Sequence, residues 1–426
     1  MLKKIFLDKK IINDILKRGG ITFLFRMIAM ALSFITMSYI TNFFGKDIFG
    51  NYSLTLTVLQ IVVMVFAIGT PYAFISFTGG FENNEKAKGL LFKVSKIVLV
   101  LSILPVIVFF FGAQFLAEFV FNKAELTDYF LIISASIPFM ILHELLCYYF
   151  VSIKKTLFYS LITFIFPNVL FLIFLVIVFY FKLPTSLVLA CYTLAYLISV
   201  LIGFINVFSG KKAIYPILST RAIIKKSFPM MVSGIFLILL NWTDILMLGK
   251  LETSSNIGIY NAAFKVGYLA LFFVVSMNVV IMPKISELFH QKDHLELKKV
   301  VNRSTQIVII LTIPAALILI FFSKSILQLF GEGFEVGSTT LILITLGALF
   351  NAMTGNVDQI LNMTDNQNIV KNIFFIGFIL NVVLNLYLIP NYGIEGAATS
   401  SLITNIFVNS IFVIIIKRKL GFYTFM

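Results

Sequence analysis

Residues 226–284 read KSFPMMVSGIFLILLNWTDILMLGKLETSSNIGIYNAAFKVGYLALFFVVSMNVVIMPK. Two long apolar runs, 228–249 and 258–283, are joined by a short polar connection, and Asp244 and Lys265 lie inside them. A charged side chain at the centre of a bilayer costs about 3 kcal/mol on insertion scales, so such residues usually face a cavity or a partner. This stretch therefore predicts a pair of membrane helices that lines a polar interior.

The composition of the whole chain favours the same class of protein. Of the 426 residues, 60% are hydrophobic and only 12% are charged, whereas soluble domains carry about 25% charged residues. The net charge of +14 does not indicate nucleic-acid binding, because the basic residues lie in short loops between apolar runs, as topology determinants do. We therefore predict an all-α polytopic membrane protein.

Twelve apolar segments each approach the roughly 20 residues that cross a hydrocarbon core. The predicted spans are 20–41, 52–77, 91–112, 128–151, 157–180, 184–207, 228–249, 258–283, 305–322, 338–362, 369–389 and 395–416. Three of them (52–77, 258–283 and 338–362) are long, which predicts tilt, kinks or ends that emerge into water. The domains expected are a cytoplasmic segment 1–19, an N-lobe 20–207, a cytoplasmic linker 208–227, a C-lobe 228–416 and a cytoplasmic tail 417–426.

The distribution of basic residues gives the orientation. With the amino terminus inside, the inner segments carry 26 Lys and Arg residues and the outer loops carry 5. Cytoplasmic loops are the basic ones in membrane proteins, so both termini are expected in the cytoplasm.

The two halves of the chain resemble each other at spacings of 208, 209 and 213 residues. The matching pairs are 49–52 with 257–260, Pro105 with Pro314, and Asn168 with Asn381. Six helices per copy is an even number, so the copies would share one orientation and form a parallel repeat. Such repeats indicate a transporter with its site between the lobes.

Several motifs resemble those of polysaccharide flippases in the multidrug/oligosaccharidyl-lipid/polysaccharide exporter superfamily. They are Pro229, Asp244-Ile-Leu-Met-Leu-Gly249, Gly258-Ile-Tyr260-Asn-Ala-Ala263, Leu329-Phe-Gly331-Glu-Gly-Phe334, and the run from Asn385 to Ala398. The resemblance implies two six-helix lobes around a central cavity that opens alternately to either side of a bacterial inner membrane. It also implies an oligosaccharide cargo on a polyprenyl diphosphate, for assembly of O-antigen, capsule or exopolysaccharide.

The first function that we expect is therefore a lipid-linked oligosaccharide flippase, which is a transporter and not an enzyme. An ion-coupled exporter of drugs or small amphiphiles on the same fold is the alternative. A membrane polysaccharide polymerase or ligase is less favoured, because the outer loops are short and poor in catalytic residue types. The expected partners are the lipid-linked oligosaccharide, membrane lipids, and polysaccharide polymerase and chain-length proteins; no nucleic acid, cofactor or metal is expected.

Basic residues are the first candidates for contact with cargo. Related flippases place bases of the first and eighth helices in the cavity, which by resemblance assigns Arg26 and Lys265 to the diphosphate. Asn261 and Tyr268 recur with Lys265 at helical spacing, and Asn241 is a further polar residue in the seventh span. Arg26 lies close enough to the cytoplasmic end to snorkel to lipid headgroups instead.

Acidic residues are the second group of candidates. Asp244, Asp358 and Glu144 could each couple an ion, relay a proton or neutralise a nearby base. Asp358 belongs to a polar stripe in the tenth span together with Asn351, Thr354 and Asn362. A further group, Asn381, Asn385, Asn405 and Asn409, is interpreted as hydrogen-bonding glue between helices.

The balance of these groups departs from what the resemblance implies. Three intramembrane acids against two bases do not make the strongly cationic cavity expected of a diphosphate carrier. Lys46 and Lys154, at the ends of spans, could then supply part of the phosphate contacts.

Overall fold

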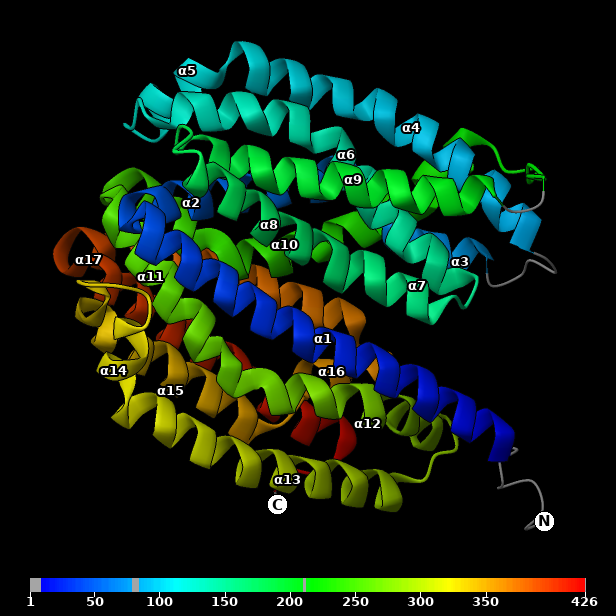
Figure 1. Ribbon diagram of the computed structural model, residues 1–426. Helices are drawn as coiled ribbons and strands as arrows, with labels where there is room; N and C mark the ends of the chain where they lie inside the picture. Colours follow the sequence, from blue (N-terminus) through cyan, green and yellow to red (C-terminus); the bar gives the residue numbers. More distant parts are fainter. Residues whose placement is uncertain (1–8, 79–83, 210–211, 426) are drawn as a thin grey trace. The chain divides into compact units, whose positions relative to one another are not determined.

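The computed structural model describes residues 9–78, 84–209 and 212–425, and every regular element in these ranges is a helix (Figure 1). Part of the predicted amino-terminal segment 1–19 and residues 210–211 of the predicted linker lie outside the described residues. The all-α prediction is confirmed for the ranges described.

The helices fall into two compact units, which are described separately. Unit 1 contains Met1–Ile40 and Val58–Ile235, and unit 2 contains Thr41–Thr57 and Phe236–Met426. The boundaries fall inside three helices, α1 (Lys9–Phe44), α2 (Lys46–Phe66) and α10 (Thr220–Leu251). The lobe boundaries expected from the sequence stay a prediction.

In unit 1, α6 packs against α4 and α9, and α9 packs in turn on α8 (Figure 1). The elements of this unit that follow α2 are α3 (Thr70–Thr78), α4 (Asn84–Phe111), α5 (Ala113–Phe115), η2 (Leu116–Val120), α6 (Leu126–Ser152), α7 (Thr156–Ser160), η3 (Leu161–Ile165), α8 (Phe166–Tyr180) and α9 (Leu187–Phe208). The π-helical turn η3 divides the predicted span 157–180, directly before Pro167 at the start of α8.

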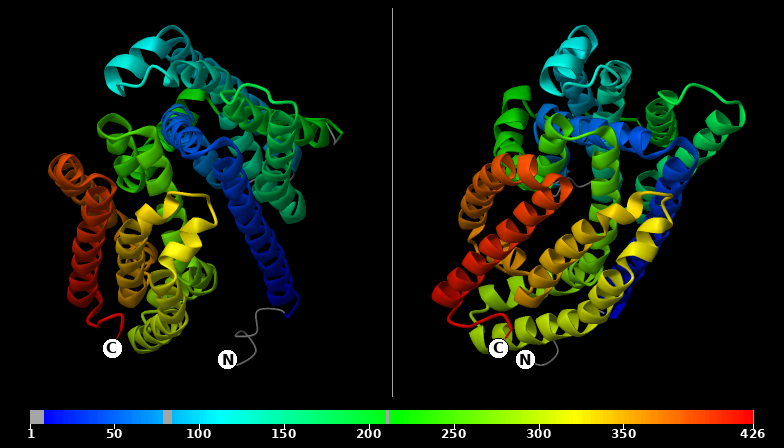
Figure 2. Two further views of the ribbon diagram at one scale, coloured as in Figure 1. Left: turned by 60° about the vertical axis from the view of Figure 1, so that its left-hand side comes forward. Right: turned by 90° about the vertical axis from the view of Figure 1, so that its left-hand side faces the viewer.

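In unit 2, α15 packs between α13 and α17, which lie on either side of it in both views of Figure 2. The elements that follow α10 are α11 (Ser254–Gly267), η4 (Tyr268–Leu271), α12 (Phe272–His290), α13 (His294–Phe321), α14 (Ser323–Gln328), η5 (Phe334–Gly337), α15 (Ser338–Thr354), α16 (Val357–Met363) and α17 (Gln367–Leu420). The element α17 merges two helices across a kink at Gly393, where φ is 54°. The predicted spans 369–389 and 395–416 lie on either side of that kink.

Within the described ranges, ten helices are long and apolar enough to cross a membrane, and eleven if the bent α10 counts as one span. Large apolar side chains are exposed along several of them. In α4 they include Leu99, Val100, Ile103, Leu104, Ile107 and Val108, and in α13 they include Ile307, Ile310, Leu311, Leu317 and Ile318. Such a surface suits hydrocarbon, in which the helix satisfies every backbone hydrogen bond internally. The prediction of a multi-pass membrane protein is confirmed.

The three long segments each contain a break, as their length predicted. The segment 52–77 is interrupted after Phe66, where Ile68 and Gly69 have positive φ, and α3 follows. The segment 258–283 contains the 3-10 turn η4. The segment 338–362 ends its first helix at Thr354, and Gly355 has a φ of +78°.

Two glycines create a close crossing of α2 and α11 inside unit 2. A Cβ atom on Gly50 would lie 1.7 Å from the Ser254 carbonyl oxygen, and one on Gly258 would lie 2.4 Å from the Lys46 carbonyl oxygen. These obstacles are backbone atoms, which cannot rotate away. Gly50 and Gly258 are also the matching glycines of the two sequence segments that are 208 residues apart.

Candidate functional site

The carboxylate of Asp244 is the most enclosed charged group in the described part of unit 2, with 1% of the residue exposed. It lies on α10 inside an apolar helix, and four side chains from α11 and α17 donate hydrogen bonds to it. Tyr260 Oη donates to Oδ2 at 2.6 Å, and Ser401 Oγ donates to the same oxygen. Asn385 Nδ2 and Asn381 Nδ2 donate to Oδ1 at 2.7 and 3.2 Å.

All four donors to Asp244 in the described structure are neutral. Tyr260 comes from α11, Asn381 and Asn385 lie before the kink of α17, and Ser401 lies after it. Neutral donors offset the desolvation of a buried carboxylate only in part, because they do not cancel its charge. None of the four donors therefore compensates the negative charge of Asp244.

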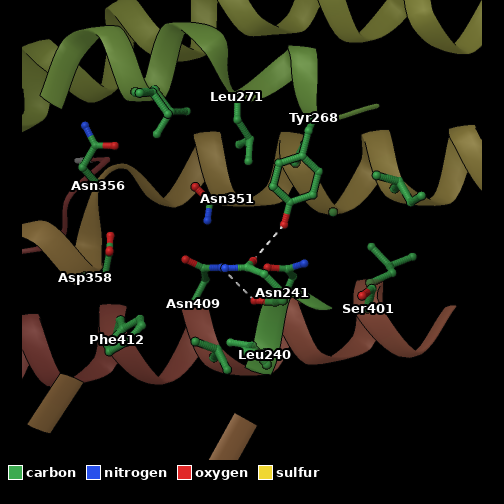
Figure 3. Close-up of a pocket in the computed structure, with 18 of the residues that line it drawn as sticks. Leu240, Asn241, Tyr268, Leu271, Asn351, Asn356, Asp358, Ser401, Asn409 and Phe412 are labelled. Atoms are coloured by element: carbon green, nitrogen blue, oxygen red, sulfur yellow. Dashed lines mark hydrogen bonds between the residues drawn. The ribbon is translucent and has the colours of Figure 1, made fainter. Parts of the chain in front are cut away.

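A cavity of about 290 Å³ lies beside this cluster, entirely within unit 2 (Figure 3). Its polar lining is dominated by side-chain amides from α10, α12, α15 and α17 and the segment before α16. These amides are Asn241, Asn278, Asn351, Asn356, Asn405 and Asn409. Figure 3 shows Asn241, Asn351 and Asn409 pointing toward one another from three different helices. The remaining polar contributions include Asp358, Gln359, Tyr268 and Ser401.

A smaller recess of about 30 Å³ shares wall residues with both the cavity and the Asp244 cluster. Its walls include Asn241 and Tyr268, which also line the cavity, and Asn381 and Ser401, which donate to Asp244. Such a volume is roughly that of one water molecule. Ser401 also lines the larger cavity, so one of the donors to Asp244 faces that space directly.

The candidate residues of the eighth span do not share one surface. Tyr268 lies in η4 and lines the cavity, where its hydroxyl donates to Asn241 Oδ1 at 3.3 Å. Asn261 is 2% exposed and is not among the residues that line the cavity. The ammonium of Lys265 lies 5.6 Å from the ring centroid of Phe49, within cation–π distance.

The polar stripe expected in the tenth span is divided by the break at Gly355. Asn351 lines the cavity from α15 and Asp358 lines it from α16, where Gln359 Nε2 donates to Asp358 Oδ2 at 2.9 Å. Thr354 instead donates to the Asn351 carbonyl of its own helix. Asn351 and Asp358 thus line one cavity from two different helices, because Gly355 ends α15 and changes the direction of the chain.

Two candidates lie in unit 1. Arg26 is exposed on α1, and its guanidinium carbon lies 5.8 Å from the ring centroid of Phe164. Glu144 is half-buried on α6, next to His143, whose Nε2 hydrogen-bonds the Ile162 carbonyl at 3.2 Å. Binding roles for Arg26 and Glu144 stay predictions.

Sequence reasoning found Asp244 but missed its partners Tyr260 and Ser401. Asn381 and Asn385 do join helices, as expected, since they reach from α17 to α10. The other two of that group, Asn405 and Asn409, line a cavity instead. Asn381 and Asn385 are four residues apart and therefore lie on one face of a helix. Asp244 is an acid inside another apolar helix, so this spacing is the signal that could have indicated Asp244 as their acceptor.

Comparison with known proteins gives the family. The profile described as "Polysaccharide biosynthesis protein" matches residues 15–289. The chain belongs to this family. A second profile, MatE, matches residues 229–387. The resemblance to polysaccharide flippases inferred from the sequence is thereby confirmed.

Individual relatives are distant. The "Probable low-salt glycan biosynthesis flippase Agl15" of Haloferax volcanii is 25% identical over 162 residues, which are 38% of this chain and 34% of that protein. The match thus spans about a third of that relative's length.

Solved structures show the fold. A lipid II flippase, MurJ, in an inward closed conformation has a TM-score of 0.75 and 19% identity over 93% of this chain and 87% of that chain. An inward-facing multidrug resistance MATE family transporter of the MOP superfamily has a TM-score of 0.78 and 11% identity over 95% of this chain and 98% of that chain. The chain therefore has the helical fold seen in these two transporters.

Proposed function

We propose that this chain is a flippase that moves polyprenyl-diphosphate-linked oligosaccharides from the cytoplasmic to the outer leaflet of a bacterial inner membrane. The cargo would serve assembly of O-antigen, capsule or exopolysaccharide. The observation that carries the proposal is a polar interior, formed by Asp244 and the amide-lined cavity, inside helices with apolar outer faces. The family match and the flippase name of the Haloferax relative support a glycan on a lipid as the cargo.

The mechanism proposed is alternating access between two six-helix lobes, formed by twelve spans in a parallel repeat. The bent α10 and the two parts of α17 would be three of the twelve spans. Both termini would be cytoplasmic, as the 26-to-5 distribution of basic residues favours. Polysaccharide polymerase and chain-length proteins would receive the translocated product.

Within this mechanism, Asp244 is the proposed coupling residue. One monovalent cation or one proton would neutralise a carboxylate that four neutral donors already surround. The bound charge would favour one state of the transporter because it changes how strongly α10 holds α11 and α17. Asp358 and Glu144 stay proposed as further acids of the transport path.

Arg26 and Lys265 are the proposed contacts of the diphosphate. A guanidinium can grip phosphate oxygens with two parallel hydrogen bonds, and an ammonium acts as a point charge. Alanine variants of both residues should fail to restore surface polysaccharide in a strain that lacks the gene. Full restoration by both single variants would refute this assignment.

Translocation in proteoliposomes tests the function directly. Purified protein is reconstituted with a fluorescent polyprenyl-diphosphate oligosaccharide, and glycosidase added outside measures the exposed fraction under imposed proton or sodium gradients. Wild type should move the lipid faster with one of these gradients than without it. Asp244→Asn should lose at least about tenfold of that acceleration, whereas Asp365→Asn, at an exposed turn, should retain it.

The match to the MatE profile favours a second candidate, an ion-coupled exporter of drugs or small amphiphiles. The same vesicles loaded with a cationic dye separate the two. Dye transport without movement of lipid-linked sugar would replace the flippase proposal by the exporter. Neighbouring genes for glycosyltransferases would support the flippase.

A further inference from the structure

We propose that the amide-lined cavity of unit 2 binds neutral sugar rings of the cargo and disfavours acidic sugars. This inference rests on the flippase function proposed above and adds the class of sugar. It also separates sugar binding, in the cavity, from diphosphate binding, which requires bases elsewhere.

The chemistry of the lining matches hydroxyl groups. Each of the six asparagines that line the cavity carries two N–H donors and one acceptor oxygen, and a sugar hydroxyl both donates and accepts. The side-chain oxygens of Asn278 and Asn356 are buried and have no hydrogen-bond donor within the described residues. A buried acceptor without a donor is costly, so a ligand or water that supplies hydroxyl groups here would be stabilised.

Aromatic rings supply the second component of a sugar site. Phe264, Tyr268, Phe374 and Phe412 line the same cavity. The rings of Phe264 and Tyr268 are neighbours, with centroids 4.3 Å apart and planes inclined by 31°. The face of an aromatic ring is negative and suits the weakly positive C–H face of a pyranose.

The size of the cavity limits what it can hold. Its volume of about 290 Å³ is at the lower end of small-molecule sites, which begin near roughly 300 Å³. The cavity therefore admits a short part of a glycan and not a whole lipid-linked repeat unit. The remaining sugars and the lipid have to lie outside it.

Charge decides which sugars fit. Among the described residues that line the cavity, Asp358 is the only carboxylate, and none is Lys, Arg or His. A hexuronic acid in this space would bring a second negative charge close to Asp358 without a cation to balance it. Neutral hexoses and N-acetylhexosamines carry no such cost.

The position of the single tryptophan provides a direct measurement. Trp242 follows Asn241 in the chain, and its ring centroid lies 6.2 Å from that of Phe264, which lines the cavity. Purified full-length protein in nanodiscs is titrated with three probes, and the tryptophan fluorescence is recorded. The probes are a polyprenyl diphosphate, the same lipid with a neutral N-acetylhexosamine disaccharide, and the same lipid with a hexuronic acid as the second sugar. Wild type should bind the neutral glycolipid several-fold more tightly than the other two probes.

Two sets of substitutions distinguish the contribution of the amide side chains to binding from that of the Asp358 carboxylate. The double variant Asn351→Leu, Asn409→Leu keeps similar side-chain volumes and should lower the affinity for the neutral glycolipid several-fold, toward that of the bare polyprenyl diphosphate, because hydrogen bonds to the sugar are lost. Asp358→Asn should bring the acidic glycolipid close to the neutral one in affinity. Asn168→Leu is the matched control, because Asn168 lies in unit 1 and its amide donates to the Phe164 carbonyl of its own segment.

The outcomes distinguish this proposal from the flippase function. If wild type translocates lipid-linked sugar but the double variant binds the neutral glycolipid as tightly as wild type does, the sugar site is refuted and the flippase stands. If wild type neither binds nor translocates any glycolipid, the proposed function itself fails. Should the double variant also lose the bare lipid, Asp358→Asn decides the question, and an unchanged ratio of acidic to neutral affinity overturns the proposal.

Discussion

The close crossing of α2 and α11 predicts that a single methyl group added at Gly50 or Gly258 will destabilise the protein. In Gly258→Ala the new methyl group would meet the Lys46 carbonyl oxygen at 2.4 Å, so the helices have to separate by about 1 Å to restore ordinary contact. Gly50→Ala requires more, since its methyl group would lie 1.7 Å from the Ser254 carbonyl oxygen. Overpacking of this kind costs about 1–3 kcal/mol. Alanine recovers about 0.5–1 kcal/mol through its better helix propensity.

The expected net loss of free energy of unfolding is about 1–2 kcal/mol for Gly258→Ala and more for Gly50→Ala. For a unit of this size, each kcal/mol lowers the melting temperature by about 2–4 °C. The assay is thermal unfolding of the detergent-solubilised protein, followed by circular dichroism. Gly20→Ala is the control, because no atom lies within 4 Å of its Cβ position in α1.

The double variant adds a test that a general loss of stability would not pass. Once one methyl group has separated the helices, the second meets less resistance, so the combined loss should be smaller than the sum of the single losses. The reasoning is refuted if Gly50→Ala and Gly258→Ala melt within error of Gly20→Ala, or if their losses simply add.

Three further predictions follow from other features. Tyr260→Phe removes one donor from Asp244 and should lower the free energy of unfolding by about 2 kcal/mol, the worth of a hydrogen bond to a charged group; chemical denaturation that shows no change would contradict it. Gly355→Ala should be destabilised by about 1–3 kcal/mol and should weaken binding of the neutral glycolipid, because φ is +78° and a Cβ would lie 2.4 Å from Thr305 Oγ1. Tyr423→Cys should react with a membrane-impermeant maleimide in inside-out vesicles only, because the C-terminal tail is proposed to be cytoplasmic. Both native cysteines are buried and should give little background labelling. Labelling in right-side-out vesicles would contradict the proposed orientation.

The sequence predicted those features that depend on a single apolar segment, namely its charged residues and its breaks. Asp244 and Lys265 are recognisable because a charge interrupts a run that otherwise suits lipid. The breaks at Gly69 and Gly355 were foreseeable as kinks, since the predicted spans were too long for one straight helix. Each of these breaks lies at a residue with a positive φ, and the length of a segment does not show which residue that is.

The surroundings of Asp244 could not be read in the same way. Its donors Asn381 and Ser401 are 137 and 157 residues away along the chain, and only helix packing brings them to one carboxylate. The amide cavity is a similar case. Each asparagine taken alone is consistent with a bond to a neighbouring helix, and the enclosed space between Asn351 and Asn409 appears only when several helices are assembled.

A carrier also has to release what it picks up, and the walls of the amide cavity bear on that step. Neutral hydrogen bonds to a sugar replace bonds to water almost evenly, so a site made of asparagines would hold its guest briefly. Departure into the outer leaflet would then need no strong grip to be broken. Turnover would then be limited by the reorientation of the empty or loaded protein. Weak individual hydrogen bonds between the asparagines and the sugar would be an advantage for repeated transport cycles.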